Sequence, residues 1–104
     1  MKNKRLKKTQ QLIDYYLTTR YVYGIEEALK KLVDLTTKEN YLQITKYIAD
    51  KNVKKSELNL SMFIVEIACK DYQELIPIIN NNLKIFKDKD AIEDLEEALQ
   101  KINS

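Results

Sequence analysis

The segment LNLSMFIVEIAC, residues 58–69, decides the fold because Glu66 is its only charged residue. Placed on a helix at about 100° per residue, its large side chains form one apolar face: Leu60, Phe63, Ile64 and Ile67. The remaining apolar residues cover the other sides, so other segments must enclose such a helix. A buried strand is the alternative, since several of these residues have β propensity. The helical patterns on both flanks favour a central helix over residues 57–70.

The composition favours an all-α domain. A chain of 104 residues with 44% hydrophobic residues is large enough for one core, and we expect a single domain over residues 1–104. One glycine and one proline argue against sandwiches and barrels, which need many turns. We therefore expect a compact bundle or a short stack of helical hairpins, with five to six helices around the buried central helix. Residues 1–5 are expected to be a flexible basic terminus.

Helix boundaries follow from apolar periodicity and capping residues. The first helix is expected over residues 5–23, ended by Gly24 in a left-handed conformation, and the second over residues 25–36. A capping box of Thr36 and Glu39 predicts a third helix to about residue 52. Its inward candidates are Leu42, Ile44, Tyr47 and Ile48.

Capping pairs also open the two helices after the central one. Asp71 with Glu74 predicts a helix that is bent at Pro77 and ends near residue 82 or residue 86. Asp90 with Glu93 predicts the last helix. The apolar face of that helix is Ile92, Leu95, Ala98, Leu99 and Ile102.

A faint register of 31 residues runs through the helices. It aligns Ile13 with Ile44, and Tyr41 with Tyr72. The spacing resembles that of ankyrin and tetratricopeptide arrays, but their diagnostic residues are absent. Any protein of α-hairpins with equal loops would produce such a register, so it indicates stacked hairpins and leaves a repeat ancestry open.

The sequence offers little catalytic chemistry. It has no histidine, and it lacks a glycine-rich phosphate loop, paired cysteines and a nucleophile elbow. The Asp88-Lys89-Asp90 triplet lacks the remaining residues of a calcium loop and is interpreted as helix capping. Glu66 is expected to reach water at the helix edge; a structural ion pair and a catalytic acid are the alternatives. We therefore expect no enzyme activity, no cofactor and no metal.

Cys69 is the only cysteine, which excludes an internal disulfide and suits a reducing compartment. It is expected to be a small buried hydrophobic residue. The basic N-terminus is not followed by an apolar signal region, and no run is long enough to span a membrane. The sequence therefore predicts a cytoplasmic protein.

Four of the seven tyrosines lie between residues 15 and 23, around Arg20. On a first helix reaching residue 23, Tyr15 and Val22 point away from the core face and form a second apolar strip. Tyrosine and arginine are enriched at binding hot spots. The proposed partner-binding residues are Tyr15, Arg20, Tyr21, Val22 and Tyr23, unless this helix is sandwiched between neighbours or ends before Val22.

Charge is unevenly distributed along the chain. Residues 1–31 hold eight basic and three acidic residues, a net charge of +5, whereas residues 88–104 hold two basic and six acidic residues, a net charge of −4. A basic terminus that contacts phosphates would make the chain a nucleic-acid-binding accessory protein, the main alternative function. The residues that would do so are Lys2, Lys4, Arg5, Lys7 and Lys8.

These features together predict a small, non-catalytic, intracellular regulator or adaptor that binds another protein or a second copy of itself. In size, charge and helix content the chain resembles small bacteriocin-immunity proteins and phage-encoded inhibitors of host systems. That likeness is one of class and no motif carries it.

Overall fold

The computed structural model describes residues 2–51, 57–70 and 72–103, with the side chains of residues 8–50, 57–70 and 72–103. Within this part of the chain the structure is helical and contains no strand, so the predicted all-α class is confirmed. The elements are α1 (Lys2–Thr18), α2 (Val22–Leu35), α3 (Tyr41–Lys51), α4 (Glu57–Ile67), the 3-10 turn η1 (Ala68–Lys70), α5 (Leu75–Ile85) and α6 (Lys89–Asn103). The backbone of residues 2–5, which the sequence predicted to be a flexible terminus, is part of α1.

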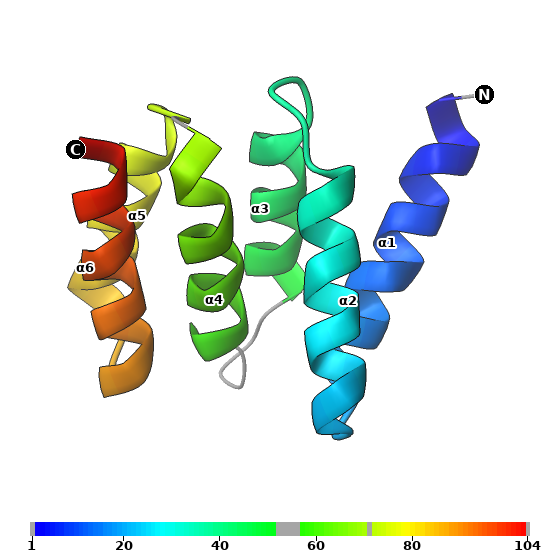
Figure 1. Ribbon diagram of the computed structural model, residues 1–104, viewed down its shortest axis with the longest axis horizontal. Helices are drawn as coiled ribbons and strands as arrows, with labels where there is room; N and C mark the ends of the chain where they lie inside the picture. The colour runs from blue at the N-terminus through cyan, green and yellow to red at the C-terminus, as the bar shows by residue number, and fades with distance from the viewer. Residues whose placement is uncertain (1, 52–56, 71, 104) are drawn as a thin grey trace.

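The helices form three stacked hairpins in two layers (Figure 1). Each hairpin pairs one helix of each layer: α1 with α2, α3 with α4, and α5 with α6. In one layer α4 lies between α2 and α6 and contacts both, and in the other layer α1 contacts α3. The arrangement is the short stack of hairpins that the sequence predicted as one of two architectures.

The central helix is α4, and the predicted face of it is buried. Leu60, Phe63, Ile64 and Ile67 are all at most 2% exposed. The helix is not enclosed on every side, however, because Glu66 and Cys69 are exposed. The prediction for Glu66 is thereby confirmed. The prediction that Cys69 is buried is wrong: the tight turn η1 places Cys69 one turn above Glu66 on the solvent side, where its Sγ lies 3.5 Å from the Glu66 carbonyl oxygen.

The first helix ends five residues earlier than predicted. α1 stops at Thr18, residues 19–21 are not helical, and α2 begins at Val22. Gly24 is therefore buried inside α2 and does not end a helix. Thr18 and Thr19 are poor helix formers, and the Thr18 hydroxyl donates to the Asp14 carbonyl at 2.7 Å.

Two of the predicted caps differ from the observed ones, and a third, Asp71, lies outside the described residues. Thr36 ends α2: its backbone is extended and its N–H donates to the Val33 carbonyl, while its hydroxyl donates to the Leu32 carbonyl at 2.6 Å. Asn40 closes the following turn, where its side-chain oxygen accepts from the Thr37 N–H at 2.7 Å. The predicted box of Thr36 and Glu39 is thus not formed. The N-terminal cap of α6 is Asp88. Its carboxylate oxygen Oδ1 accepts hydrogen bonds from the backbone N–H groups two and three residues later, at 2.9 and 3.2 Å.

Two further predictions about single helices need correction. Leu42, an inward candidate, is 36% exposed, whereas Ile44 and Ile48 on the same helix are buried. Pro77 lies in the first turn of α5, where its missing N–H would have no helical partner. The reason to expect a bend there disappears, and α5 continues through the three asparagines to Ile85.

Contacts between hairpins occur at a constant spacing in the sequence. Hydrogen bonds between residues 33 positions apart join Tyr47 to Asp14, Tyr41 to Glu74, and Ser61 to Asp94, at 3.2, 3.4 and 3.3 Å. Tyr41 and Tyr72, which the 31-residue register aligns, stack with their ring centroids 4.0 Å apart. Stacking of hairpins of similar length produces such a register.

Lysines from one hairpin donate hydrogen bonds to backbone carbonyls near the helix C-termini of the preceding hairpin. Lys70 Nζ donates to the carbonyls of Val33 and Thr36 at 3.2 and 3.4 Å, at the end of α2. Lys101 Nζ donates to the Val65 carbonyl at 3.4 Å, near the end of α4. A cation at a helix C-terminus satisfies free carbonyls and opposes the negative end of the helix dipole.

Candidate binding surface

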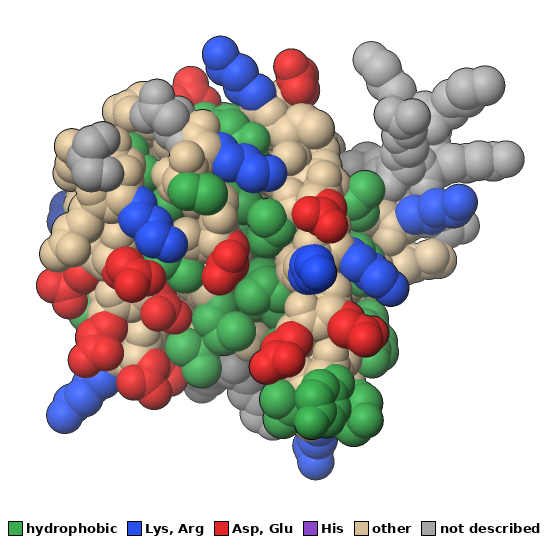
Figure 2. Space-filling model, viewed as in Figure 1, with side chains coloured by type: hydrophobic (Ala, Val, Ile, Leu, Met, Phe, Trp, Pro, Cys, Tyr) green, Lys and Arg blue, Asp and Glu red, His purple; other side chains and the backbone are tan. Residues whose placement is uncertain are grey.

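The five predicted partner-binding residues lie together at the corner between α1 and α2. This tyrosine corner comprises Tyr15 on α1, Arg20 and Tyr21 in the link, and Val22 and Tyr23 in the first turn of α2. The exposed fractions of the four apolar residues are 48% for Tyr15, 65% for Tyr21, 64% for Val22 and 67% for Tyr23. Figure 2 shows hydrophobic side chains protruding over the lower end of α2, the end nearest this corner.

The first helix ends before Val22, the alternative that the sequence left open, so these residues do not share a face of that helix. Because α1 ends at Thr18, only Tyr15 belongs to that helix. The chain reverses direction in residues 19–21, and this reversal brings the first turn of α2 next to the last turns of α1 (Figure 1). The residues are gathered by the hairpin turn and not by helical periodicity.

Gly24 allows Tyr15 to lie close against α2. A methyl group built on Gly24 would collide with the Tyr15 hydroxyl, and it would lie 3.3 Å from the Thr19 hydroxyl oxygen. The single glycine of the chain is therefore used for close approach of a side chain, a role for which a residue without Cβ is suited. This packing holds the half-exposed ring of Tyr15 in one place.

Tyr21 and Tyr23 support each other at the edge of the corner. Their ring centroids lie 5.7 Å apart with an interplanar angle of 63°, an edge-to-face arrangement that aromatic pairs prefer. The Tyr21 N–H donates to the Thr19 hydroxyl at 3.3 Å, which holds the link in place. The exposed rings are thus partly ordered by contacts within the chain.

Charged side chains border the corner on two sides. Arg20 is exposed in the link, and Glu26 and Glu27 are exposed on α2. The two glutamates follow Tyr23 by three and four residues, so they lie on the same face one turn further along the helix. In Figure 2, acidic side chains lie just above the protruding hydrophobic group and a basic one lies below it. Sequence reasoning missed the two glutamates as part of this surface because it placed them on a different helix from the tyrosines.

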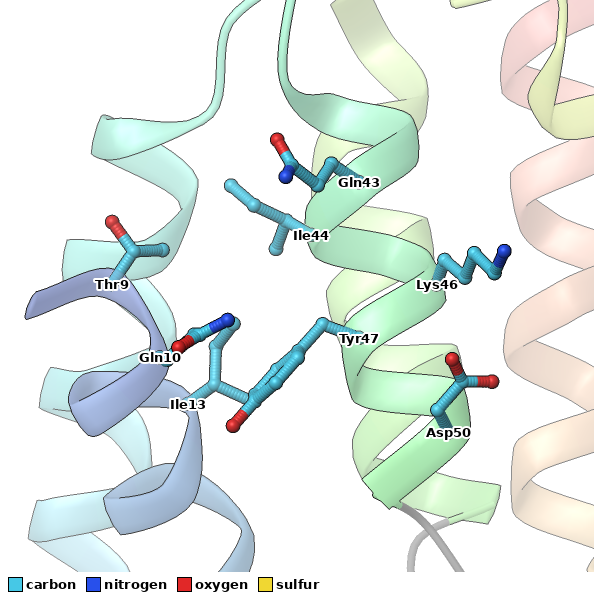
Figure 3. A pocket seen from close by; sticks show the side chains of 8 residues that line it. All are labelled: Thr9, Gln10, Ile13, Gln43, Ile44, Lys46, Tyr47 and Asp50. Atoms are coloured by element: carbon cyan, nitrogen blue, oxygen red, sulfur yellow. The ribbon is translucent and has the colours of Figure 1, made fainter. Parts of the chain in front are cut away.

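A shallow pocket of about 180 Å³ lies between α1 and α3 (Figure 3). Ile13 and Ile44 are its buried apolar residues, and Gln10 and Gln43 provide amide groups from the two helices. The ring of Tyr47 points from α3 toward α1, and its hydroxyl donates to the Asp14 carboxylate at 3.2 Å. This contact joins the two hairpins across the pocket.

A second open pocket, of about 260 Å³, lies between α2 and α4 and includes Glu66. Leu29 and Val33 provide its apolar surface, and its charged residues are Glu26, Lys30, Asp34 and Glu66. All four charged residues are exposed.

The residues of the alternative, nucleic-acid-binding function lie on α1. Lys8 is exposed. Lys2, Lys4, Arg5 and Lys7 belong to the backbone of α1, but their side chains lie outside the described residues.

Two other features are absent from the part of the chain that the structure describes. No group of three or more His, Cys, Asp or Glu residues there is placed to hold a metal ion. Among the same residues, no helix combines the length and the apolar character that crossing a membrane requires. Comparison of the chain with protein-family models, curated proteins and solved structures gave no match.

Proposed function

We propose that the chain is a small, non-catalytic protein-binding module, acting as an inhibitor, immunity-type protein or adaptor, and that the tyrosine corner is its binding surface. The observation that carries this proposal is the clustering of exposed apolar side chains. Of the seven large hydrophobic residues that are exposed in the described part of the chain, four belong to the corner. The other three, Leu35, Leu42 and Ile85, belong to three different helices.

The chemistry of the corner suits binding of a protein. Tyrosine supplies a large contact area with only two rotatable side-chain bonds, so immobilising it costs little entropy. Tyr15 packs against Gly24, and Tyr21 packs against Tyr23, which reduces that cost further. Arg20 adds a group that pairs with carboxylates and stacks on aromatic rings.

Two observations support a non-catalytic role and our further proposal that the protein is cytoplasmic. Glu66, the candidate catalytic acid, is exposed at an open pocket, where water screens its charge. Cys69 is an exposed thiol, a group that persists in a reducing compartment such as the cytoplasm.

Site-specific photo-cross-linking in the native host tests the proposal. A photoreactive phenylalanine analogue replaces Tyr23, and the matched control carries it at Ile85, which is equally exposed at 67% on α5. We expect discrete protein adducts from position 23 and none of the same adducts from position 85. Equal adduct patterns from both positions, or none from position 23, would contradict the proposal.

An electrophoretic mobility assay at low salt tests the alternative function. The basic terminus predicts a shift of nucleic acid that disappears as salt increases. Absence of a shift at low salt eliminates that alternative.

A further inference from the structure

We propose that the tyrosine corner binds the same corner of a second copy of this chain, forming a reversible two-fold dimer. This inference rests on the proposed function and names the partner of that surface. It follows from the distribution of charge around the corner, which makes the surface complementary to itself.

The apolar centre of the corner has opposite charges on its two sides. Arg20 lies before the apolar residues of α2, and Glu26 and Glu27 lie one turn beyond them. In Figure 2, acidic side chains lie above the protruding hydrophobic group and a basic side chain lies below it. The direction from Arg20 to the two glutamates therefore gives the surface a positive side and a negative side.

Two-fold symmetry can place the positive side of this surface in one copy against the negative side in the other. In a two-fold dimer the same patch faces itself. When the axis lies in the contact plane and crosses the Arg20-to-glutamate direction at a right angle, each Arg20 faces Glu26 and Glu27 of the second copy. The same rotation brings the rings of Tyr21 and Tyr23 onto their counterparts. Two equivalent charge contacts then flank one aromatic centre.

The exposed area indicates a weak dimer. With about 200 Å² for a whole tyrosine side chain, the exposed fractions of Tyr15, Tyr21 and Tyr23 correspond to about 360 Å². A stable interface buries about 800 Å² on each partner. These three tyrosines supply less than half of this area, so we expect dissociation constants in the range of about 10 μM to 1 mM, typical of transient contacts.

Sedimentation equilibrium of the purified chain is the first test. We expect the weight-average mass to rise above that of the monomer as concentration increases toward about 1 mM, and the rise to be smaller at high salt because the flanking charges are exposed. A monomer at every concentration overturns the proposal.

Charge exchange is the second test, and it identifies the surface. One variant carries Arg20→Glu, and the other carries Glu26→Lys with Glu27→Lys. Alone, each variant places like charges in both contacts, and we expect its self-association to weaken at least about tenfold. Mixed in equal amounts, the two variants restore opposite charges in both contacts, so we expect a heterodimer of wild-type affinity. Recovery in the mixture also shows that both variants are folded.

The matched control exchanges charge elsewhere. Lys84→Glu changes an exposed residue of α5, which is remote from the corner along the stack, and we expect its self-association to equal that of the wild type. Dimers that survive Arg20→Glu, or a mixture that stays monomeric, overturn the two-fold corner dimer.

Failure of this inference is distinguishable from failure of the proposed function. A monomeric chain whose position 23 still gives adducts with a different protein overturns the dimer alone. A chain that self-associates without adducts from position 23 overturns both, because the corner is then not the contact.

Discussion

Tyr16 and Asn59 bind each other reciprocally across the two layers of the fold. The Tyr16 hydroxyl donates to the Asn59 carbonyl at 2.8 Å, and the Asn59 side-chain amide donates to the Tyr16 carbonyl at 3.4 Å. Burial raises the pKa of the Tyr16 hydroxyl far above its usual range, and the charges of Asp94 and Glu66 add to this increase. Tyr16 therefore remains a proton donor and links α1 to α4, 43 residues further along the chain.

Removing this hydroxyl tests the link. Tyr16→Phe leaves the Asn59 carbonyl without its donor, and we expect the free energy of unfolding to fall by about 1–2 kcal/mol. Urea unfolding measures the difference. The control Tyr23→Phe alters a ring that is 67% exposed, and its effect should stay within about 0.5 kcal/mol. Equal effects of the two changes would contradict the role given to Tyr16.

Truncating the centre of α4 tests the core. Phe63 is fully buried, so Phe63→Ala should lower the free energy of unfolding by about 3–5 kcal/mol, a large part of the about 5–15 kcal/mol typical of a domain. Ile85→Ala, at a residue 67% exposed, should cost less than about 0.5 kcal/mol in the same urea titration. A cost below about 1 kcal/mol for Phe63→Ala would mean that α4 is not the centre of the core.

The environment of Asp94, between α4 and α6, predicts that the free energy of unfolding depends on pH. Burial raises the pKa of the Asp94 carboxyl above its unfolded value of 3.8; the hydrogen bond from Ser61 opposes the increase, and the charges of Glu97, Asp90 and Asp88 add to it. A raised pKa in the folded state favours the protonated form. The contribution of Asp94 to stability is therefore fully present below pH 3.8 and is lost as pH rises through the folded-state pKa.

Asp94→Asn removes this titration while keeping an acceptor for the Ser61 hydroxyl. We expect the variant to be more stable than the wild type near pH 7, with an advantage that shrinks steadily as the pH is lowered toward about 4. Urea midpoints at several pH values measure the difference. An advantage that stays constant or grows on acidification would contradict the raised pKa.

The contact between Gly24 and Tyr15 predicts that substitutions at these two positions have non-additive effects on the free energy of unfolding. Gly24→Ala adds helix propensity worth about 1 kcal/mol but forces the Tyr15 hydroxyl to move. In a chain that also carries Tyr15→Ala the collision is absent, so Gly24→Ala should be more stabilising there by about 1 kcal/mol. A double-mutant cycle of unfolding free energies measures this coupling. A coupling near zero would show that the two residues are not in forced contact.

The interior of the fold was predictable because it depends on hydrophobic periodicity. The apolar residues of segment 58–69 indicate a central helix, and four of them, Leu60, Phe63, Ile64 and Ile67, form its buried face. The position of Glu66 in water follows from the same pattern. A charged residue inside an apolar run is stable only where it reaches solvent or a partner.

The helix ends were harder to predict because several residues suit two roles. Gly24 matches a helix C-terminus in sequence, but it serves the close approach of a tyrosine inside α2. Thr36 matches an N-terminal cap but ends the preceding helix. In both cases a contact between elements, which no local pattern contains, decides the role.

The residues of the candidate surface are exposed, but they do not lie on the face of one helix, as the sequence suggested. Tyr21 is exposed in the link that reverses the chain, and Val22 and Tyr23 are exposed in the first turn of α2; the Thr18-Thr19 pair was the signal for that link. Cys69 was misplaced because the sequence predicted that the central helix is enclosed on every side, whereas the side that carries Glu66 is exposed.

The central claim is that the tyrosine corner binds a protein and contributes little to the core. The variant Tyr15→Ala with Val22→Ala, bearing the photoreactive group at position 23, tests both parts when its melting temperature and its cross-linked adducts are measured together. We predict a melting temperature within about 5 °C of the chain that carries the same group and no other change, and loss of the adducts. A chain that no longer folds cooperatively, or one that retains every adduct, would contradict the claim.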